Sequence, residues 1–151
     1  MKSNTLTNKL NCRDYYGSFD DFLITEIKDD QNSDDYSWGV YLNFVRISVG
    51  GCQQKVKQHD NVLFAYVSSS TTTFLKLSGP EVVVINTWVV LVVTDGEGQP
   101  VEGAKIGDDA SNAEGRIFKE FKSEGTNSLK AEKENSIRSN VLKIEFINAP
   151  Q

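Results

Sequence analysis

The sequence predicts a mainly β protein, and three observations favour this class. Apolar residues show almost no helical periodicity along the 151 residues. β-branched and aromatic residues instead form short alternating runs that Gly, Asp, Asn and Ser interrupt. In the second half these runs recur about every 8 to 12 residues with turns between them, which is typical of a β-sandwich. The length suits one ordinary domain or two small ones.

Four strands are expected in the first half of the chain. They span residues 22–27, 37–43, 46–49 and 61–67. Alternation in the second of them places Trp38, Val40 and Leu42 on one face. An acidic loop, KDDQNSDD at 28–35, precedes that strand. The run SSSTTT at 68–73 follows the last strand and is typical of a linker or a loosely packed edge.

The second half is predicted to hold six strands. They span residues 81–84, 87–94, 104–106, 115–121, 126–132 and 141–147. The turn DGEG at 95–98 separates two of them. Residues 74–77 can pair with either half, so we place the boundary near 73–78. The predicted domains are therefore residues 1–73 and 74–151.

Composition argues against two classes of partner. The net charge is −5 and the isoelectric point about 4.9, so no nucleic acid partner is expected, because phosphate binding needs a basic face. The longest apolar run, EVVVINTWVVLVV at 81–93, is too short and too β-branched for a membrane helix, so no membrane insertion is expected. The N-terminal MKSNTLTNKLNC shows no apolar segment of a secretory signal.

The stretch GCQQKVKQHD at 51–60 contains the residue types of a nucleophilic triad, Cys52, His59 and Asp60. Cys52 and His59 lie seven residues apart, which permits a hairpin contact without indicating one, and no helix N-terminus is expected at Cys52 to activate its thiol. We therefore predict no catalytic residue and no enzymatic activity. The sequence has one histidine and two cysteines without metal-binding spacing, so we predict no metal site. The glycines are expected in turns rather than in a phosphate-binding loop, so no cofactor is predicted.

A disulfide between Cys12 and Cys52 has a physical rationale. A first half of this size buries a small core. The bond would close a loop of about 40 residues, for which chain entropy gives roughly 3 to 4 kcal/mol when native strain is low. An intermolecular bond that joins two subunits is the alternative.

Four aspartate pairs punctuate the sequence, at 20–21, 29–30, 34–35 and 108–109. Because the spacing of an EF-hand is absent, most of these aspartates are expected in solvated loops. Weak Ca²⁺ binding at one of the loops is the alternative. Asp20 and Asp21 differ because they adjoin an apolar strand. We expect one of them to anchor a nearby turn through backbone N–H groups.

Aromatic residues crowd the first half, and most are expected in its core. Tyr15, Tyr16, Tyr36 and Phe44 flank strands and form the candidate binding surface. In the second half, Trp88 lies in a strand that is almost entirely apolar, so both faces of that strand are expected to be covered. Burial of Trp88 within the monomer is the expectation, and a contact between domains or between subunits is the alternative.

The first half also resembles a domain found in bacterial and fungal surface proteins that is similar to the C-terminal β-domain of transcobalamin. The resemblance spans about residues 14–67 and rests on GSFDDFLITEI at 17–27, WGVYLN at 38–43, VGGCQ at 49–53 and HDNVLFAY at 59–66. It implies a β-grasp-like fold without catalytic residues. Where the resembling domain has a turn glycine before aspartate, this chain has His59, for which we expect a positive φ in an exposed turn.

The second half resembles an immunoglobulin-like domain of the kind appended to surface proteins. The resembling stretches are VVTDGEGQPVEGAKI at 92–106, NAEGR at 112–116 and SIRSN at 136–140. Fungal proteins that join both domain types look similar over most of the chain. In size, cysteine content and general pattern the chain is also similar to crystal-forming proteins of fungal sporangiophores, which assemble in vacuoles.

These observations predict a structural or interaction protein. It would act through self-assembly, crystalline or disulfide-linked, or through surface adhesion, with further copies of itself as partners. The alternative is a module that binds a small molecule or glycan at the aromatic first domain. The resemblances imply an extracellular, cell-surface or vacuolar location.

Overall fold

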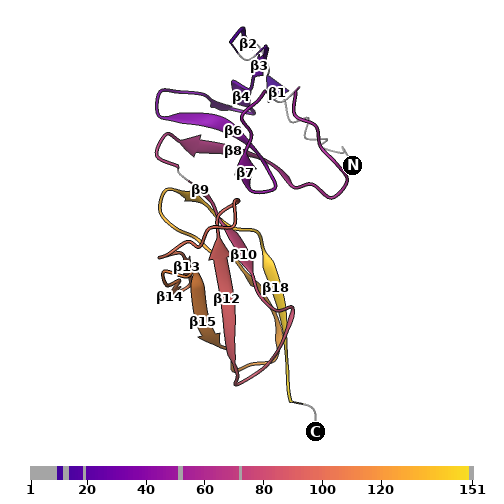
Figure 1. Cartoon of the computed structure of the whole chain (residues 1–151), viewed down its shortest axis with the longest axis vertical. Coiled ribbons are helices and arrows are strands. Elements are labelled where there is room, and N and C mark those ends of the chain that lie inside the picture. The colour runs from indigo at the N-terminus through magenta and orange to yellow at the C-terminus, as the bar shows by residue number, and fades with distance from the viewer. Residues whose placement is uncertain (1–9, 12–13, 19, 51–52, 72, 150–151) are drawn as a thin grey trace, which may run out of the picture. The chain divides into compact units, whose positions relative to one another are not determined.

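The computed structural model of the protein describes residues 10–11, 14–18, 20–50, 53–71 and 73–149. These residues form strands, turns and loops, and none of them lies in a helix, so the mainly β class is confirmed. The chain divides into two compact units, Met1–Ser70 and Thr71–Gln151 (Figure 1). The boundary expected from the sequence falls a few residues after this division.

Within its described residues, the first unit is built from small antiparallel sheets. The first contains β1 (Leu10–Asn11), β4 (Glu26–Ile27) and β5 (Asp30–Gln31), the second β2 (Asp14–Tyr16) and β3 (Asp21–Leu23), and the third β7 (Val45–Arg46), β6 (Tyr36–Leu42) and β8 (Val62–Ser68). The pairing of β6 with β8 extends from Tyr36 opposite Ser68 to Leu42 opposite Val62. This hairpin is therefore the main support for side chains in the first unit.

Alternation along β6 separates a buried face from a half-buried one. Gly39 and Tyr41 are buried, whereas Trp38 and Val40 lie on the opposite face, where the alternation of the sequence places them together. A Cβ atom on Gly39 would lie 2.9 Å from Cε2 of Tyr41, so glycine makes room for that ring. Burial raises the pKa of the Tyr41 phenol, and the charge of Arg46 on the neighbouring β7 opposes this shift.

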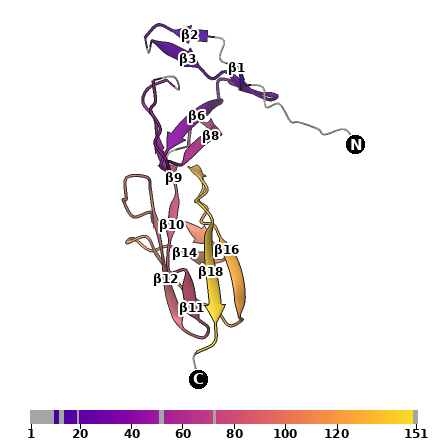
Figure 2. The same cartoon turned by 90° about the vertical axis from the view of Figure 1, so that its right-hand side faces the viewer.

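The second unit contains two three-stranded sheets that share one core (Figures 1 and 2). The first sheet has the order β10 (Lys76–Ser78), β12 (Trp88–Thr94), β15 (Arg116–Glu120), and the second has the order β11 (Val82–Val84), β18 (Leu142–Ile147), β16 (Gly125–Leu129). Shorter pairs join β13 (Lys105–Ile106) to β14 (Asp109–Ala110) and β9 (Thr73–Phe74) to β17 (Ser136–Ile137). β11 runs parallel to β18 and β9 runs parallel to β17, while the other pairings are antiparallel.

Inward-facing side chains of both sheets form the core of the second unit. Fully or almost fully buried members are Leu75, Leu77, Leu91, Val93, Ile117, Ile144 and Phe146. The Phe146 ring packs against Phe121, with 4.1 Å between the ring centroids. Alternation along β12 thus directs one of its faces into the core and the other outward.

Side-chain hydrogen bonds from the segment before β18 complete this core. The Asn140 amide acts as a strand partner for Leu77, because Oδ1 accepts from the Leu77 N–H at 2.9 Å and Nδ2 donates to the Leu77 carbonyl at 3.0 Å. The buried hydroxyl of Ser139 accepts a hydrogen bond from the Ala131 N–H at 2.8 Å. These bonds give hydrogen-bond partners to backbone groups of Leu77 and Ala131, two buried core residues.

Candidate functional site

The residues of the sequence-predicted sites lie in different parts of the first unit where the structure describes them. Cys12 and Cys52 lie outside the described residues, so their disulfide stays a prediction. The backbones of Tyr15 and Tyr16 belong to β2, whereas Tyr36 begins β6 in another sheet. Phe44 is half-buried in the turn after β6, with a φ of 73°. The structure therefore does not unite Tyr36 with the two tyrosines of β2 in one sheet.

The turn at His59 has a structural explanation. His59 is exposed with a φ of 73°, which confirms the expectation of a positive-φ turn. The two carboxylate oxygens of Asp60 accept hydrogen bonds from the Asn43 side-chain amide at 2.8 Å and from the Lys57 N–H at 2.7 Å. These bonds, led by that from Asn43, lower the pKa of Asp60. Asp60 therefore ties its turn to the end of β6.

Asp21 anchors a second turn. It is only 3% exposed, and Oδ2 accepts a hydrogen bond from the Gln53 N–H at 3.1 Å. A Cβ atom on Gly50 would lie 2.1 Å from the same oxygen, so glycine lets the turn approach the carboxylate. The prediction that one of the two adjacent aspartates anchors a turn is confirmed for Asp21, and this carboxylate has a structural role.

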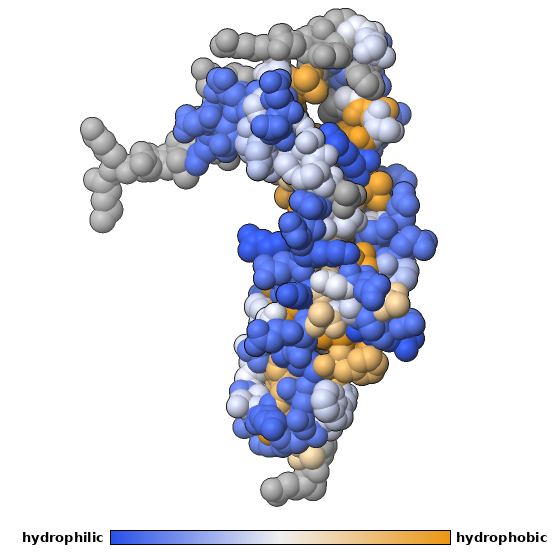
Figure 3. Space-filling model, turned by 90° about the vertical axis from the view of Figure 1, so that its left-hand side faces the viewer, coloured by the Kyte–Doolittle hydropathy of each residue, from blue (hydrophilic) through white to orange (hydrophobic). Residues whose placement is uncertain are grey.

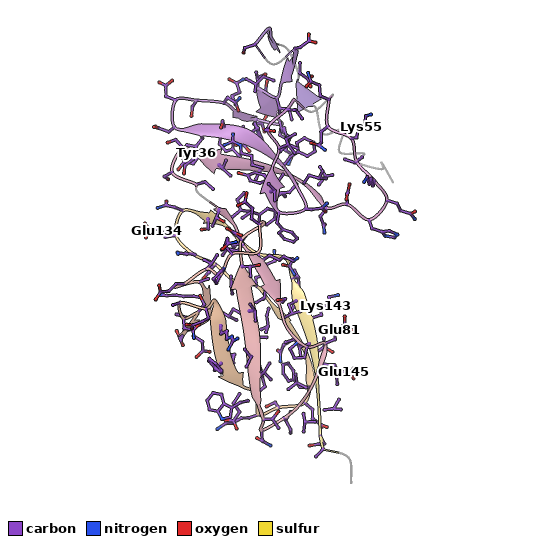
Figure 4. All side chains as sticks on the ribbon, in the orientation of Figure 1. Tyr36, Lys55, Glu81, Glu134, Lys143 and Glu145 are labelled. Atoms are coloured by element: carbon purple, nitrogen blue, oxygen red, sulfur yellow. The ribbon has the colours of Figure 1, made fainter. Side chains whose placement is uncertain are left out.

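Three aromatic side chains gather on the half-buried face of β6 and β8, and we call them the aromatic cluster. The ring centroid of Tyr66 lies 5.5 Å from that of Tyr36 and 5.3 Å from that of Trp38. Trp38 Nε1 donates to the Asp30 carbonyl at 2.8 Å, and the Tyr66 hydroxyl donates to the Gln31 carbonyl at 2.5 Å. Both inner rings are thereby fixed against β5, while Tyr36 remains 47% exposed at the end of the cluster (Figure 4).

The outward face of β12 and β15 exposes large apolar side chains. Trp88 is 72% exposed, Val90 41% and Phe118 51%. Val90 and Phe118 are directly opposite each other in the sheet, and Trp88 lies one outward position along β12. We call these three residues the Trp88 face. The expectation that Trp88 is buried within the monomer is wrong, because only the other face of β12 meets the core.

The second sheet presents a different outward face. β18 directs Lys143, Glu145 and Ile147 outward, and the labelled Lys143 and Glu145 extend from the side of β18 in Figure 4. Thr126 and Ser128 of β16 lie opposite Glu145 and Lys143. Figure 3 shows the side of β13, β14 and β15 instead, where hydrophobic residues reach the surface of the second unit among hydrophilic ones. The outward positions shared by β16 and β18 are mostly polar or charged, and β11 adds the exposed Val82 opposite Glu145. The outward positions of these three strands carry no aromatic ring, unlike the Trp88 face.

Sequence reasoning missed two contributors to these surfaces. Phe118 gains its importance from the register that sets it opposite Val90, and Tyr66 from the register that sets it opposite Trp38. Each belonged to an expected strand, but a single strand does not reveal which residue lies across from it. The available signal was the general preference of aromatic residues to lie opposite aromatic or β-branched residues on the neighbouring strand.

No family model, curated protein or solved structure matches the chain. Within the described ranges, no group of three or more His, Cys, Asp or Glu side chains lies close enough to hold a metal ion. No helix among the described residues has the length and apolar character of a membrane span. The candidate sites are therefore the Trp88 face and the aromatic cluster.

Proposed function

We propose that this chain is a non-enzymatic structural or interaction protein, and that its second unit associates with another copy through the Trp88 face. The observation that carries this proposal is the joint exposure of Trp88, Val90 and Phe118 on neighbouring strands. A single exposed apolar residue is ordinary, but adjacent large ones favour an interaction site because association removes their surface from water. Tryptophan is also among the residues that most often dominate binding energy.

The finer fold classes are part of the same proposal. We regard the second unit as an immunoglobulin-like sandwich, which is supported by two short-stranded sheets around one core. We regard the first unit as a β-grasp-like domain, supported by its long β6–β8 pairing and by the resemblance to transcobalamin-like domains in surface proteins. Assembly on a surface or in a vacuolar crystal is compatible with both assignments.

Sedimentation velocity over a wide concentration range tests the self-association. The variant Phe118→Thr keeps a strand-forming residue but removes the ring, and we expect it to weaken association roughly ten- to hundredfold, as loss of a central aromatic anchor does. Val82→Thr is the matched control, because Val82 is 53% exposed but lies on the other sheet. Runs with and without reductant separate this contact from a disulfide between subunits. A wild-type protein that stays monomeric at every concentration contradicts the proposal.

The aromatic cluster favours a second function, the binding of a glycan or small molecule by the first unit. Its inner rings are held by backbone carbonyls and Tyr36 is open to solvent, which suits stacking against a flat ligand. In a Trp88→Phe background, Trp38 is the remaining one of the two tryptophans and its fluorescence reports on the cluster. We expect oligosaccharide titration to change this fluorescence, and Tyr36→Ala to weaken binding by up to about tenfold. An unchanged signal across a panel of sugars contradicts this function.

A further inference from the structure

Opposite charges flank the Trp88 face at equal distances from its centre. On β15, Phe118 has Arg116 two residues before it and Glu120 two residues after it, so all three share the outward face. Across the sheet, Arg116 is opposite Val92, Phe118 opposite Val90, and Glu120 opposite Trp88. The positive and negative ends of this surface therefore lie about 7 Å on either side of Phe118.

We infer that two copies of the chain pack these faces together about a two-fold axis that crosses the strands level with Val90 and Phe118. This inference rests on the proposed function and specifies its partner and geometry. The axis lies in the plane between the two faces, so its rotation reverses the strand direction of the second copy. Glu120 of each copy then lies over the partner's Arg116, and the two Phe118 rings meet at the centre. Such an interface is self-complementary, as a closed dimer requires.

The apolar residues fit the same axis. The rotation that pairs the charges also brings Trp88 of each copy over the partner's Val92, which is half-buried and smaller. Ser78 lies opposite Val92 on β10 and adds no bulk there. The large Trp88 side chain thus packs over smaller side chains of the facing sheet, as in other interdigitating sheet pairs.

Both charges are available for a contact with a partner. Glu120 lies 3.9 Å from the amino group of Lys122, whose side chain is 76% exposed, and such a surface pair contributes little. In the described part of the chain, the Arg116 guanidinium has no ion-pair partner. The two-fold axis would create two Arg116–Glu120 contacts beside an apolar centre, where partial burial strengthens them.

Charge reversal tests this geometry. Arg116→Glu and Glu120→Arg each place like charges together at both ends of the interface, so we expect each to weaken dimerisation at least about tenfold at low salt. The double variant restores opposite charges and should return the dissociation constant to within about threefold of the wild type. An equimolar mixture of the two single variants should form a tight heterodimer. Lys143→Glu, on the outward face of the other sheet, is the matched control and should change nothing.

The outcomes distinguish this inference from the proposed function. If Phe118→Thr dissociates the protein while the single charge reversals have no effect, or if the double variant is as weak as the singles, the two-fold arrangement is overturned and self-association through the face stands. A wild-type monomer overturns both. Circular dichroism of every variant verifies that these exposed substitutions leave the fold intact.

Discussion

Replacing Phe146 with alanine is expected to lower the free energy of unfolding of the second unit by about 3 to 5 kcal/mol. Phe146 is 1% exposed, lies in the central strand of its sheet and packs its ring against Phe121. Alanine would remove this buried apolar area and leave a cavity lined by both sheets. Urea unfolding followed by circular dichroism measures the loss.

Ile147→Ala is the matched control for this prediction. Ile147 follows Phe146 on the same strand but points outward and is 36% exposed. Its truncation should cost about 1 kcal/mol or less. Equal losses at both positions would show that β18 does not direct Phe146 into the core.

The second large effect is expected at Gly115, where alanine should destabilise the unit by about 3 kcal/mol or more. Gly115 has a φ of +71°, and a Cβ atom there would lie 2.3 Å from the Val93 carbonyl oxygen. Its own carbonyl accepts a hydrogen bond from the Val93 N–H at 2.7 Å, so the turn is tied closely to β12. The clash is with backbone, and relief would require strands to separate.

Gly98→Ala separates the two causes of this effect. Gly98 has a φ of +86°, but a Cβ atom there would meet nothing within 4 Å. Alanine at this position should therefore cost only the conformational penalty of about 1 to 2 kcal/mol. Thermal melts of both variants under one set of conditions provide the comparison, and equal losses would contradict the proposed close approach to Val93.

The longest strands were predictable because alternation and β-branched residues mark them. Strands β6, β8, β12 and β18 each start and end within about a residue of the expected ranges. The expected strand 22–27 was wrong in part, because the chain leaves β3 at Leu23 and enters β4 at Glu26. Asn32 stabilises this break by donating hydrogen bonds from its side-chain amide to the Ile24 carbonyl and from its backbone N–H to the Thr25 carbonyl. These two hydrogen bonds bridge a loop, so the pattern of apolar residues in the sequence does not indicate them.

Two-residue strands such as β14 and β17 were not predicted, since a pair of residues has no period, whereas β13 lies inside the strand expected at 104–106. β14 is defined by a tight hairpin with β13, and β17 by its pairing with the distant β9, rather than by their own composition. The same limit applies to the candidate site. The sequence identified the strand that carries Trp88, but whether its outward face is covered depends on what packs there, and only the other face packs on the core.

The parallel pairings of the second unit determine when its sheets can close during synthesis. Within this unit β9 and β11 precede β12 along the chain, whereas their partners β17 and β18 are the last strands among the described residues. Neither the second sheet nor the core can close before those final strands have been synthesised, so the apolar β12 emerges well before its covering layer is complete. Such long-range closure is slow, and the apolar strands that stay open meanwhile are exposed to aggregation during that interval.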